Sequence, residues 1–223
     1  AGKTNGMKFD LNGCLTGFDS TKDLQFDGTV VLPEYYSKDD TAYKLTSFNA
    51  DVFKGNTEIK KVILPKYITE IPDRAFEGCT NLESVVAYGV TKIGAYAFKD
   101  CTNLEDFSID NMIVEIGEKA FDGVGKLVQK VNADGSYVYE KVGEIKVMAA
   151  NADVADAVIK SGAKYITLDI SKMEDSKDKD GNVTNSYNND KAIEIPEGTE
   201  YFKLISDGKS YNNLQLKSNA SET

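Results

Sequence analysis

Apolar residues recur through the middle of the chain in columns that share one period. Phe53, Phe76, Phe98 and Phe121 are separated by 23, 22 and 23 positions. Three further columns keep the same intervals: Leu45, Ile68, Val90 and Ile113; Phe48, Ile71, Ile93 and Ile116; Ile59, Leu82, Leu104 and Leu127. A fixed period of about 20 to 29 residues predicts a stack of repeated coils, because one unit cannot bury its apolar face alone.

Each unit reads as a strand followed by a turn. In the strands, apolar residues that alternate with polar ones are expected to face inward. They are Ile59, Val62 and Leu64, then Leu82, Val85 and Ala87, then Leu104, Phe107 and Ile109. The turn around "RAFEGC" ends at Gly55, Gly78, Asp100 or Gly123, residue types that accept a positive φ. We predict a leucine-rich repeat solenoid, an α/β-type right-handed coil with a parallel β-sheet face, short helical or 3₁₀ turns and a cap at each end.

The phrase "IPDRAFEGCTNLESV" (71–85) returns almost unchanged as "IGAYAFKDCTNLEDF" (93–107). This pattern resembles the BspA-like leucine-rich repeat family of bacterial surface proteins. The matching residues are Ile71, Ala75, Phe76, Gly78, Cys79, Leu82 and Val85, followed by Ile93, Ala97, Phe98, Cys101, Leu104 and Phe107. The resemblance covers residues 45–132. It implies cell-surface or secreted placement and adhesion to host proteins or neighbouring cells.

The repeat loses its register after Leu127, because Lys130 takes the next inward position. Asp134 and Gly135 then separate two alternating runs, which predicts a hairpin protruding over residues 128–142. Farther along, apolar doublets indicate degenerate coils, with a separate small domain as the alternative. The doublets are Ile145/Val147, Ile166/Leu168, Ile193/Ile195 and Leu214/Leu216.

Local signals mark the elements at both ends of the repeat. Between the first two doublets, a helix is expected after Asn151 as N-cap and before Gly162, with Val154, Val158 and Ile159 on one face. The N-terminal "MKFDLNGCLTGFD" predicts a strand pair turning at Asn12-Gly13. "VVLPEYY" echoes "VILPKYI" 32 positions later, so the first coil should be irregular and carry a loop.

We therefore divide the chain into four parts. Residues 1–44 form an N-terminal cap and irregular first coil, and residues 45–132 form the repeats. Residues 133–144 are assigned to the protruding hairpin, and residues 145–223 to degenerate coils and a C-terminal cap.

Composition narrows the chemistry. The 223-residue chain has no histidine and a formal net charge of -10. An acidic surface disfavours nucleic acid and anionic membranes as partners. Without histidine, the usual zinc ligand and the usual acid/base catalyst are missing. No apolar run approaches the ~20 residues of a membrane-spanning helix.

Three cysteines, Cys14, Cys79 and Cys101, do not suggest a disulfide framework. Cys79 and Cys101 occupy one repeat column and should stack, as reduced core thiols or as a disulfide pair. Cys14 is expected in the core of the cap. We expect neither a cofactor nor a metal centre built on these cysteines.

Two acidic segments are candidates for chemistry. "DSKDKDGNV" (175–183) resembles half of a calcium loop, with Asp178 and Asp180 as ligands, but Ser176 and Tyr187 stand at its first and twelfth positions. The alternative is a solvated, mobile insertion. Asp106 and Asp110 lie on one strand face about 13 Å apart, too far for a glycosidase pair. We expect no enzyme activity.

The candidate binding site is the outward face of the repeat strands. It comprises Lys61, Ile63, Ser84, Val86, Tyr88, Asp106, Ser108 and Asp110. Apolar groups at positions that should see water, rimmed by charge, often mark an interaction site. The alternative is that β-branched residues simply favour strands.

We expect a non-enzymatic, monomeric binding protein, extracellular or on the cell surface, that recognises a protein partner on host or neighbouring cells. A structural spacer of a larger surface protein and a carbohydrate-binding module are the alternatives. The chain begins without an initiator Met or an apolar leader, so we expect a signal peptide to have been removed.

Overall fold

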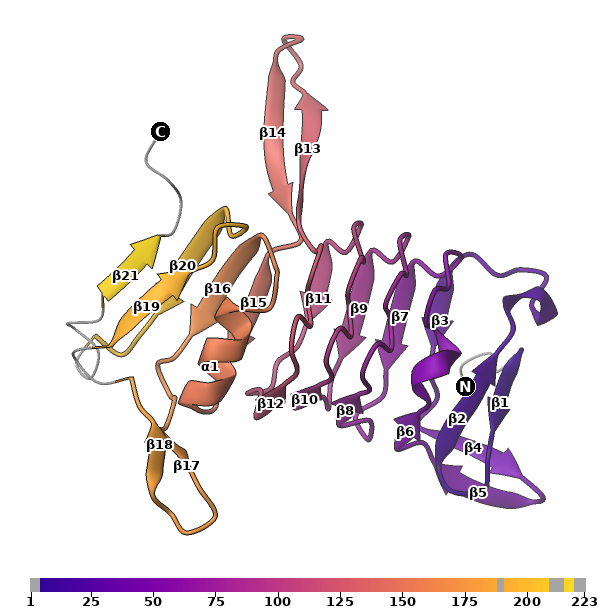
Figure 1. Cartoon of the computed structure of the whole chain (residues 1–223). Coiled ribbons are helices and arrows are strands. Elements are labelled where there is room, and N and C mark those ends of the chain that lie inside the picture. The colour runs from indigo at the N-terminus through magenta and orange to yellow at the C-terminus, as the bar shows by residue number, and fades with distance from the viewer. Residues whose placement is uncertain (1–4, 188–190, 209–214, 219–223) are drawn as a thin grey trace.

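The computed structural model describes residues 5–187, 191–208 and 215–218. Its coils lie side by side in one elongated stack, with the first strands at one end and the last strands at the other (Figure 1). A single cluster of buried apolar side chains runs through the stack from Leu15 to Ile195. Apart from Leu127, the residues of the predicted columns therefore contribute to one core.

The first wall of the stack is a parallel four-stranded sheet. Its strands, in spatial order, are β11 (Asp106–Ser108), β9 (Ser84–Ala87), β7 (Lys61–Leu64) and β3 (Thr29–Val31). Val30 pairs with Val62, Val62 with Val85, and Val85 with Phe107, and all four side chains are buried. The alternation read from the sequence thus gives the correct facing of these strands.

The second wall consists of three two-residue parallel strands. They are β8 (Glu70–Ile71), β10 (Lys92–Ile93) and β12 (Glu115–Ile116). Ile71, Ile93 and Ile116 are in register and buried. The polar residue that precedes each isoleucine points to solvent, as a half-buried strand requires.

The turns form the third wall, and their phenylalanines stack. Ring centroids of Phe53 and Phe76 lie 5.5 Å apart, those of Phe76 and Phe98 5.3 Å, and those of Phe98 and Phe121 5.4 Å. The backbone follows the same repeat, since the amide of Phe76 donates to Ala97 O and the amide of Phe98 to Ala120 O, both at 2.8 Å. Side chains and backbone thus bond each coil to the next.

Positive φ angles occur at the turn residues for which the sequence predicted them. They also occur at a second position of the later repeat turns, which the sequence did not indicate. Gly55, Gly78, Asp100 and Gly123 have φ of 69°, 76°, 61° and 83°. Arg74, Tyr96 and Lys119 also have φ of 58°, 55° and 50°. Only the first turn contains a 3₁₀ helix, η2 (Ala50–Val52), and the later ones are hydrogen-bonded turns.

At the N-terminal end, β1 (Met7–Phe9) pairs antiparallel with β2 (Cys14–Phe18), as the sequence predicts. β2 also pairs in parallel with β6 (Ser47–Phe48). A short 3₁₀ helix, η1 (Ser20–Lys22), follows β2 along the chain. The extra residues of the first coil form the hairpin of β4 (Tyr35–Lys38) and β5 (Thr41–Lys44). The irregular first coil expected from the 32-residue echo is therefore a hairpin insertion.

The expectation that Leu127 faces the core is wrong. The chain leaves the coil at Gly125 and forms β13 (Lys126–Val131), which pairs antiparallel with β14 (Tyr137–Val142). Leu127 lies in this projecting hairpin and is 53% exposed. The hairpin thus begins before residue 128, and before residue 133 where the sequence division placed it.

Two glycines make this departure possible. Gly125 and Gly143 have φ of 107° and 83°, and a Cβ on Gly143 would lie 2.6 Å from Leu104 O. Only glycine fits so close to the preceding coil. After Gly143 the chain resumes the stack, with Ile145 fully buried.

The coils continue past the hairpin. The amide of Ile113 donates to Met148 O at 2.8 Å, and the amide of Phe121 donates to Ser161 O at 3.0 Å. α1 (Ala152–Ile159) begins after Asn151, whose Oδ1 accepts from the Val154 amide, and Gly162 follows with φ of 85°. The helix prediction is confirmed, and these hydrogen bonds join the first described coil after residue 145 to the repeats.

A separate sheet follows the projecting hairpin, and its third strand is not the one that the apolar doublets predicted. β15 (Ile145–Met148) pairs in parallel with β16 (Tyr165–Asp169), and β16 pairs with β20 (Tyr201–Ile205). The doublet beside Ile166/Leu168 is therefore Phe202/Leu204 and not Ile193/Ile195. β19 (Ala192–Ile195) pairs instead with β21 (Gln215–Ser218), and Leu214 lies outside the described residues.

The acidic insertion is a hairpin rather than a loose loop. β17 (Ser176–Lys177) pairs antiparallel with β18 (Val183–Asn185). Its base is anchored, because Ser176 and Tyr187 are buried and the Tyr187 hydroxyl donates to Asp156 Oδ1 at 2.6 Å. Burial and the hydrogen bond to Asp156 raise the pKa of Tyr187 well above its ordinary range.

Candidate functional site

Six of the eight predicted site residues lie on the paired strands of the first wall, whereas Tyr88 and Asp110 follow the ends of β9 and β11. We call the solvent side of this wall the outer sheet face. It comprises Lys61, Ile63, Ser84, Val86, Tyr88, Asp106, Ser108 and Asp110, together with Thr29 and Val31 of β3, which the sequence did not single out. The parallel register brings side chains from four coils into adjacent rows.

An apolar row crosses three strands of the outer sheet face. Val31 pairs with Ile63, and Ile63 pairs with Val86. Val31 is 40% exposed, whereas Ile63 and Val86 are half-buried, so the row is less open than the sequence implied. Tyr88, beyond the end of β9, is 58% exposed and adds an aromatic group next to the row.

A polar row runs beside the apolar one. Lys61 pairs with Ser84, and Ser84 pairs with Asp106. The Asp106 carboxylate accepts from Ser108 Oγ at 3.0 Å. Asp110 lies past the end of β11, so the ladder does not place it opposite Tyr88; Asn111 Nδ2 instead donates to Tyr88 O at 2.8 Å. The charge of this row changes from positive on β7 to negative on β11.

A tyrosine pair joins the first residue of β4, Tyr35, to Tyr67 in the turn that follows β7. The hydroxyls of Tyr35 and Tyr67 are 3.0 Å apart, and Lys44 Nζ lies 4.4 Å from the Tyr67 ring centroid. Their hydrogen bond raises the pKa of Tyr35 and, with the nearby Lys66 ammonium, lowers that of Tyr67. Sequence reasoning missed this pair, although the 32-residue echo that contains both tyrosines could have indicated it.

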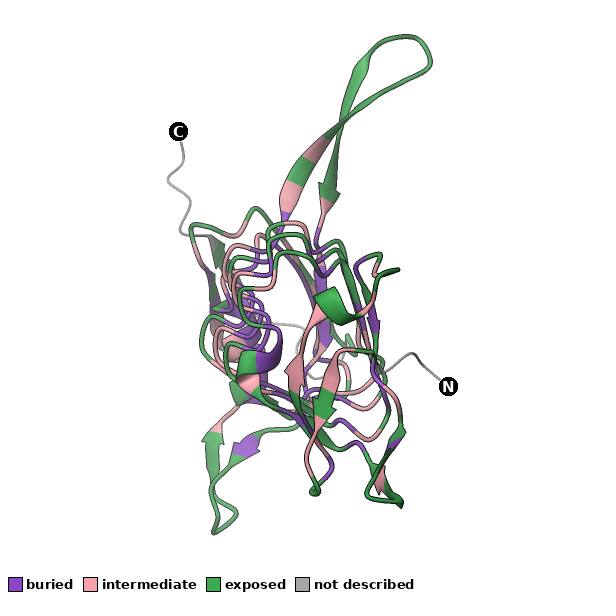
Figure 2. Ribbon diagram, turned by 90° about the vertical axis from the view of Figure 1, so that its right-hand side faces the viewer, coloured by how far each residue is buried: buried purple, intermediate pink, exposed green. Residues whose placement is uncertain are grey.

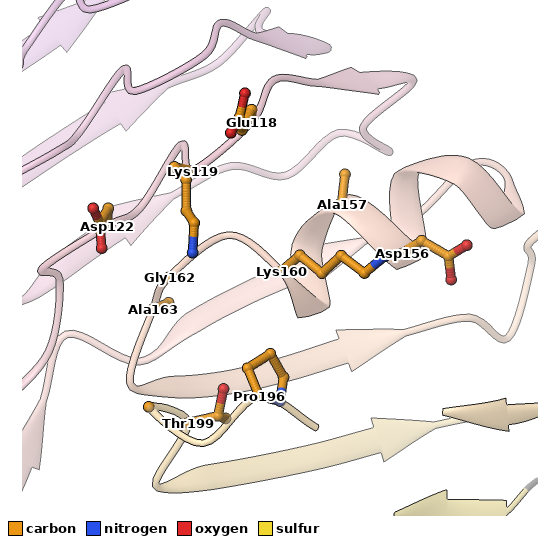
Figure 3. Close-up of a pocket in the computed structure, with 11 residues that line it drawn as sticks. Glu118, Lys119, Asp122, Asp156, Ala157, Lys160, Gly162, Ala163, Pro196 and Thr199 are labelled. Carbon is orange, nitrogen blue, oxygen red and sulfur yellow. The ribbon is translucent and has the colours of Figure 1, made fainter. Parts of the chain in front are cut away.

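A cavity of about 630 Å³ opens where the last repeat turn meets the C-terminal coils. Glu118, Lys119 and Asp122 come from the turn, Asp156 and Lys160 from the end of α1, and Pro196 and Thr199 from the turn before β20 (Figure 3). Its volume is in the range of small-molecule sites. No sequence signal indicates it, because its three segments are far apart along the chain.

One of the charged side chains that line this cavity, Asp156, is already engaged by other residues of the chain. Asp156 already accepts from Tyr187 and Asn185 and pairs with Lys191 Nζ at 3.2 Å. Figure 3 shows Lys119 directed from the repeat turn towards Gly162. The arrangement can hold a small ligand, but it does not bring a pair of carboxylates and a nucleophile together.

The cysteines are structural. Cys79 and Cys101 are free and fully buried, and their Sγ atoms donate to Phe53 O and Phe76 O, each at 3.0 Å. Burial raises the pKa of Cys79 to about 12 and raises that of Cys101 as well. Cys14 is only half-buried, contrary to expectation, because its neighbour Leu15 takes the core position.

The half calcium loop is satisfied internally. The Asp178 carboxylate accepts from the amides of Asp180 and Asn182, each at 2.9 Å, and these bonds lower its pKa. Tyr187, the twelfth position of that loop, is buried against α1 and far from a ligand role. Within the described residues, no group of three or more His, Cys, Asp or Glu side chains is placed to hold a metal ion.

Residues 39–141 match the family model described as a BspA type leucine rich repeat region, in 6 copies. This segment is similar to BspA-type leucine-rich repeat regions. It takes in a little under half of the chain, and it confirms the family resemblance carried by the "AF…C…L" phrase. No curated protein sequence matches the chain.

Solved structures share the fold of the whole stack. A leucine rich cell surface protein from Faecalibacterium prausnitzii A2-165 is similar with a TM-score of 0.52 and 16% identity, over 99% of this chain and 54% of that one. The chain therefore spans about half the length of that protein. A leucine rich repeat protein from T. pallidum is similar with a TM-score of 0.50 and 18% identity, over 92% and 84% of the two chains. These likenesses show the fold alone.

The matched region contains the residues of the outer sheet face from Lys61 to Asp110, whereas Thr29 and Val31 of that face and Tyr35 precede it. Its last matched residue falls within β14, although the stack itself continues to β20. Among the described residues, no helix is both long and apolar enough to cross a membrane.

Proposed function

We propose that this chain is a non-enzymatic binding protein of a bacterial surface, which recognises a protein partner through the outer sheet face. The observation that carries the proposal is the apolar row of Val31, Ile63 and Val86, which crosses three coils in register and is flanked by charged residues. An apolar centre with a polar rim is the usual composition of a protein interface.

Two further facts support the proposal. The face stands on a sheet whose coils are bonded to each other through backbone and side chains, so it is presented rigidly, as repeat proteins present their binding surfaces. The similar protein from Faecalibacterium prausnitzii is described as a cell surface protein, which supports an extracellular or cell-surface location. We further propose that the coil is right-handed and that the elements at both ends of the stack act as caps.

The proposal predicts that charge on the apolar row abolishes binding without unfolding the protein. The test variant is Val86→Glu with Tyr88→Glu, and the probes are an array of host extracellular proteins and a glycan array. We expect binding to a protein to weaken by at least about fivefold, because leaving a buried polar group unsatisfied costs about 1–3 kcal/mol and an unpaired carboxylate costs more.

The matched control is Val114→Glu with Val183→Glu, which adds the same charge at residues 44% and 55% exposed outside this face. It should bind as the unmodified protein does. Binding that survives in the test variant would remove the outer sheet face from the account. Binding confined to the glycan array would favour the carbohydrate-binding alternative, and a chain that binds neither array would favour the spacer.

A further inference from the structure

The projecting hairpin of β13 and β14 stands clear of the stack (Figure 1). Its two strands pair over their full length, from Lys126 with Val142 to Val131 with Tyr137. Nearly all of its residues are exposed (Figure 2). At its base Lys141 Nζ lies 4.7 Å from the ring centroid of Tyr201 in the stack. A two-stranded hairpin is marginally stable in water on its own, so the length that projects beyond this contact needs a reason.

One side of the hairpin is apolar and aromatic. Leu127, Val131, Tyr137 and Tyr139 are 53%, 66%, 66% and 63% exposed. Their odd numbers place them on the same side of both strands. Tyrosine is enriched at protein interfaces, and a patch of neighbouring exposed apolar groups marks an interaction site.

The backbone of the hairpin also offers unpaired edges. At the turn, the Asn132 amide donates to Ser136 O at 2.8 Å, so the even-numbered pairs exchange hydrogen bonds inside the hairpin. The N–H and C=O groups of the odd-numbered residues therefore point outward. On the edge of β14 these residues are Tyr137, Tyr139 and Lys141.

The two edges differ in their side chains. β13 carries Lys126 and Lys130, and lysines on an edge strand discourage the addition of another strand. β14 carries Glu140 and Lys141, of opposite charge, and Glu140 is paired with Lys130 across the hairpin. Beyond this pair each strand has one further lysine, so the β14 edge is distinguished by its two outward-facing tyrosines, Tyr137 and Tyr139, because aromatic cross-strand pairs are stabilising.

We propose that β14 pairs with β14 of a second copy of this chain, antiparallel, about a two-fold axis at Tyr139. In this register Tyr139 lies opposite Tyr139 of the partner copy, and each Tyr137 lies opposite Lys141. Every one of these residues points its backbone groups outward, so each pair exchanges both N–H···O bonds. The edge is self-complementary, because the two Tyr139 side chains meet across the axis and no like charges are opposed.

The acidic charge of the chain favours this arrangement over one that stacks the two bodies. The net charge is -10, whereas the paired strands carry Lys126, Lys130 and Lys141 against one acid, Glu140. Antiparallel hairpins hold the two acidic bodies at opposite ends of a four-stranded ribbon about 20 Å long. The contact is small, so the dimer is weak and the monomer expected from the sequence is the dilute form.

The test is sedimentation velocity on the whole chain from low to high micromolar concentration. We expect a reversible monomer–dimer equilibrium in the unmodified protein. A residue on a two-fold axis lies opposite the same residue of the other copy. Tyr139→Lys and Tyr139→Glu should therefore each remain monomeric, because two like charges would face each other. An equimolar mixture of the two variants should restore the dimer, because lysine then faces glutamate.

Gln129 is the matched control, because it lies directly opposite Tyr139 within the hairpin but on the β13 edge. Gln129→Lys and Gln129→Glu should dimerise as the unmodified protein does. A protein that stays monomeric at every concentration would overturn the inference. A dimer that survives in both Tyr139 variants, or a mixture of them that stays monomeric, would overturn it as well.

Discussion

At the residue scale, each buried thiol of the repeat column bonds to the backbone of the preceding coil. Cys79 Sγ donates to Phe53 O, and burial raises the pKa of the thiol from 9.0 to about 12. The folded protein therefore keeps this proton to a higher pH than the unfolded chain does. The stability it contributes is complete below pH 9 and is lost as the pH rises towards 12.

We predict that the free energy of unfolding falls less steeply with pH in Cys79→Ala than in the unmodified protein. Between pH 9 and pH 12 the slopes should differ by about 1.4 kcal/mol per pH unit, which is the linkage of one proton. Denaturant unfolding at a series of pH values measures this. Equal slopes in Cys79→Ala and in the unmodified protein would contradict the assignment.

At the element scale, the projecting hairpin depends on the glycine at its base. We predict that Gly143→Ala lowers the free energy of unfolding by about 1–3 kcal/mol or more, since alanine would combine a positive φ with a Cβ 2.6 Å from Leu104 O. Chemical denaturation measures the loss.

Gly135 at the hairpin tip is the control for that substitution. It has φ of 82°, but no atom lies within 4 Å of the place that a Cβ would take, so Gly135→Ala carries the conformational cost alone. A loss as large in Gly135→Ala as in Gly143→Ala would show that the close approach to the preceding coil does not matter.

The elements that could be predicted from the sequence are those whose capping or turn residues are consistent with their place in the stack. Asn151 and Gly162 bound α1 as capping chemistry predicts, and Asp134-Gly135 marks the hairpin turn. The prediction that Leu127 faces the core was wrong, because its spacing fits the repeat although the chain leaves the coil at Gly125. Such an exit depends on contact with Leu104 in the neighbouring coil, which a single sequence does not reveal.

At the scale of the whole molecule, the period of the apolar columns was enough to predict the stacked core. Phe53, Phe76, Phe98 and Phe121 lie one above another, as their spacing requires. The pairing of β16 with β20 could not be predicted, because Phe202 and Leu204 follow a long insertion that hides the period. The outer sheet face followed from strand alternation, whereas the cavity beside α1 depends on three segments that only the tertiary fold brings together.

The central claim is that the BspA-type repeats and the C-terminal coils form one stack. Hydrogen exchange of the Phe76, Phe98 and Phe121 amides tests it directly, because these donate to Ala97 O, Ala120 O and Ser161 O in successive coils. We predict that all three exchange slowly and with similar protection, as amides in one cooperative unit do. Fast exchange at Phe121 beside slow exchange at Phe76 and Phe98 would contradict the claim, because it would separate the last coils from the repeats.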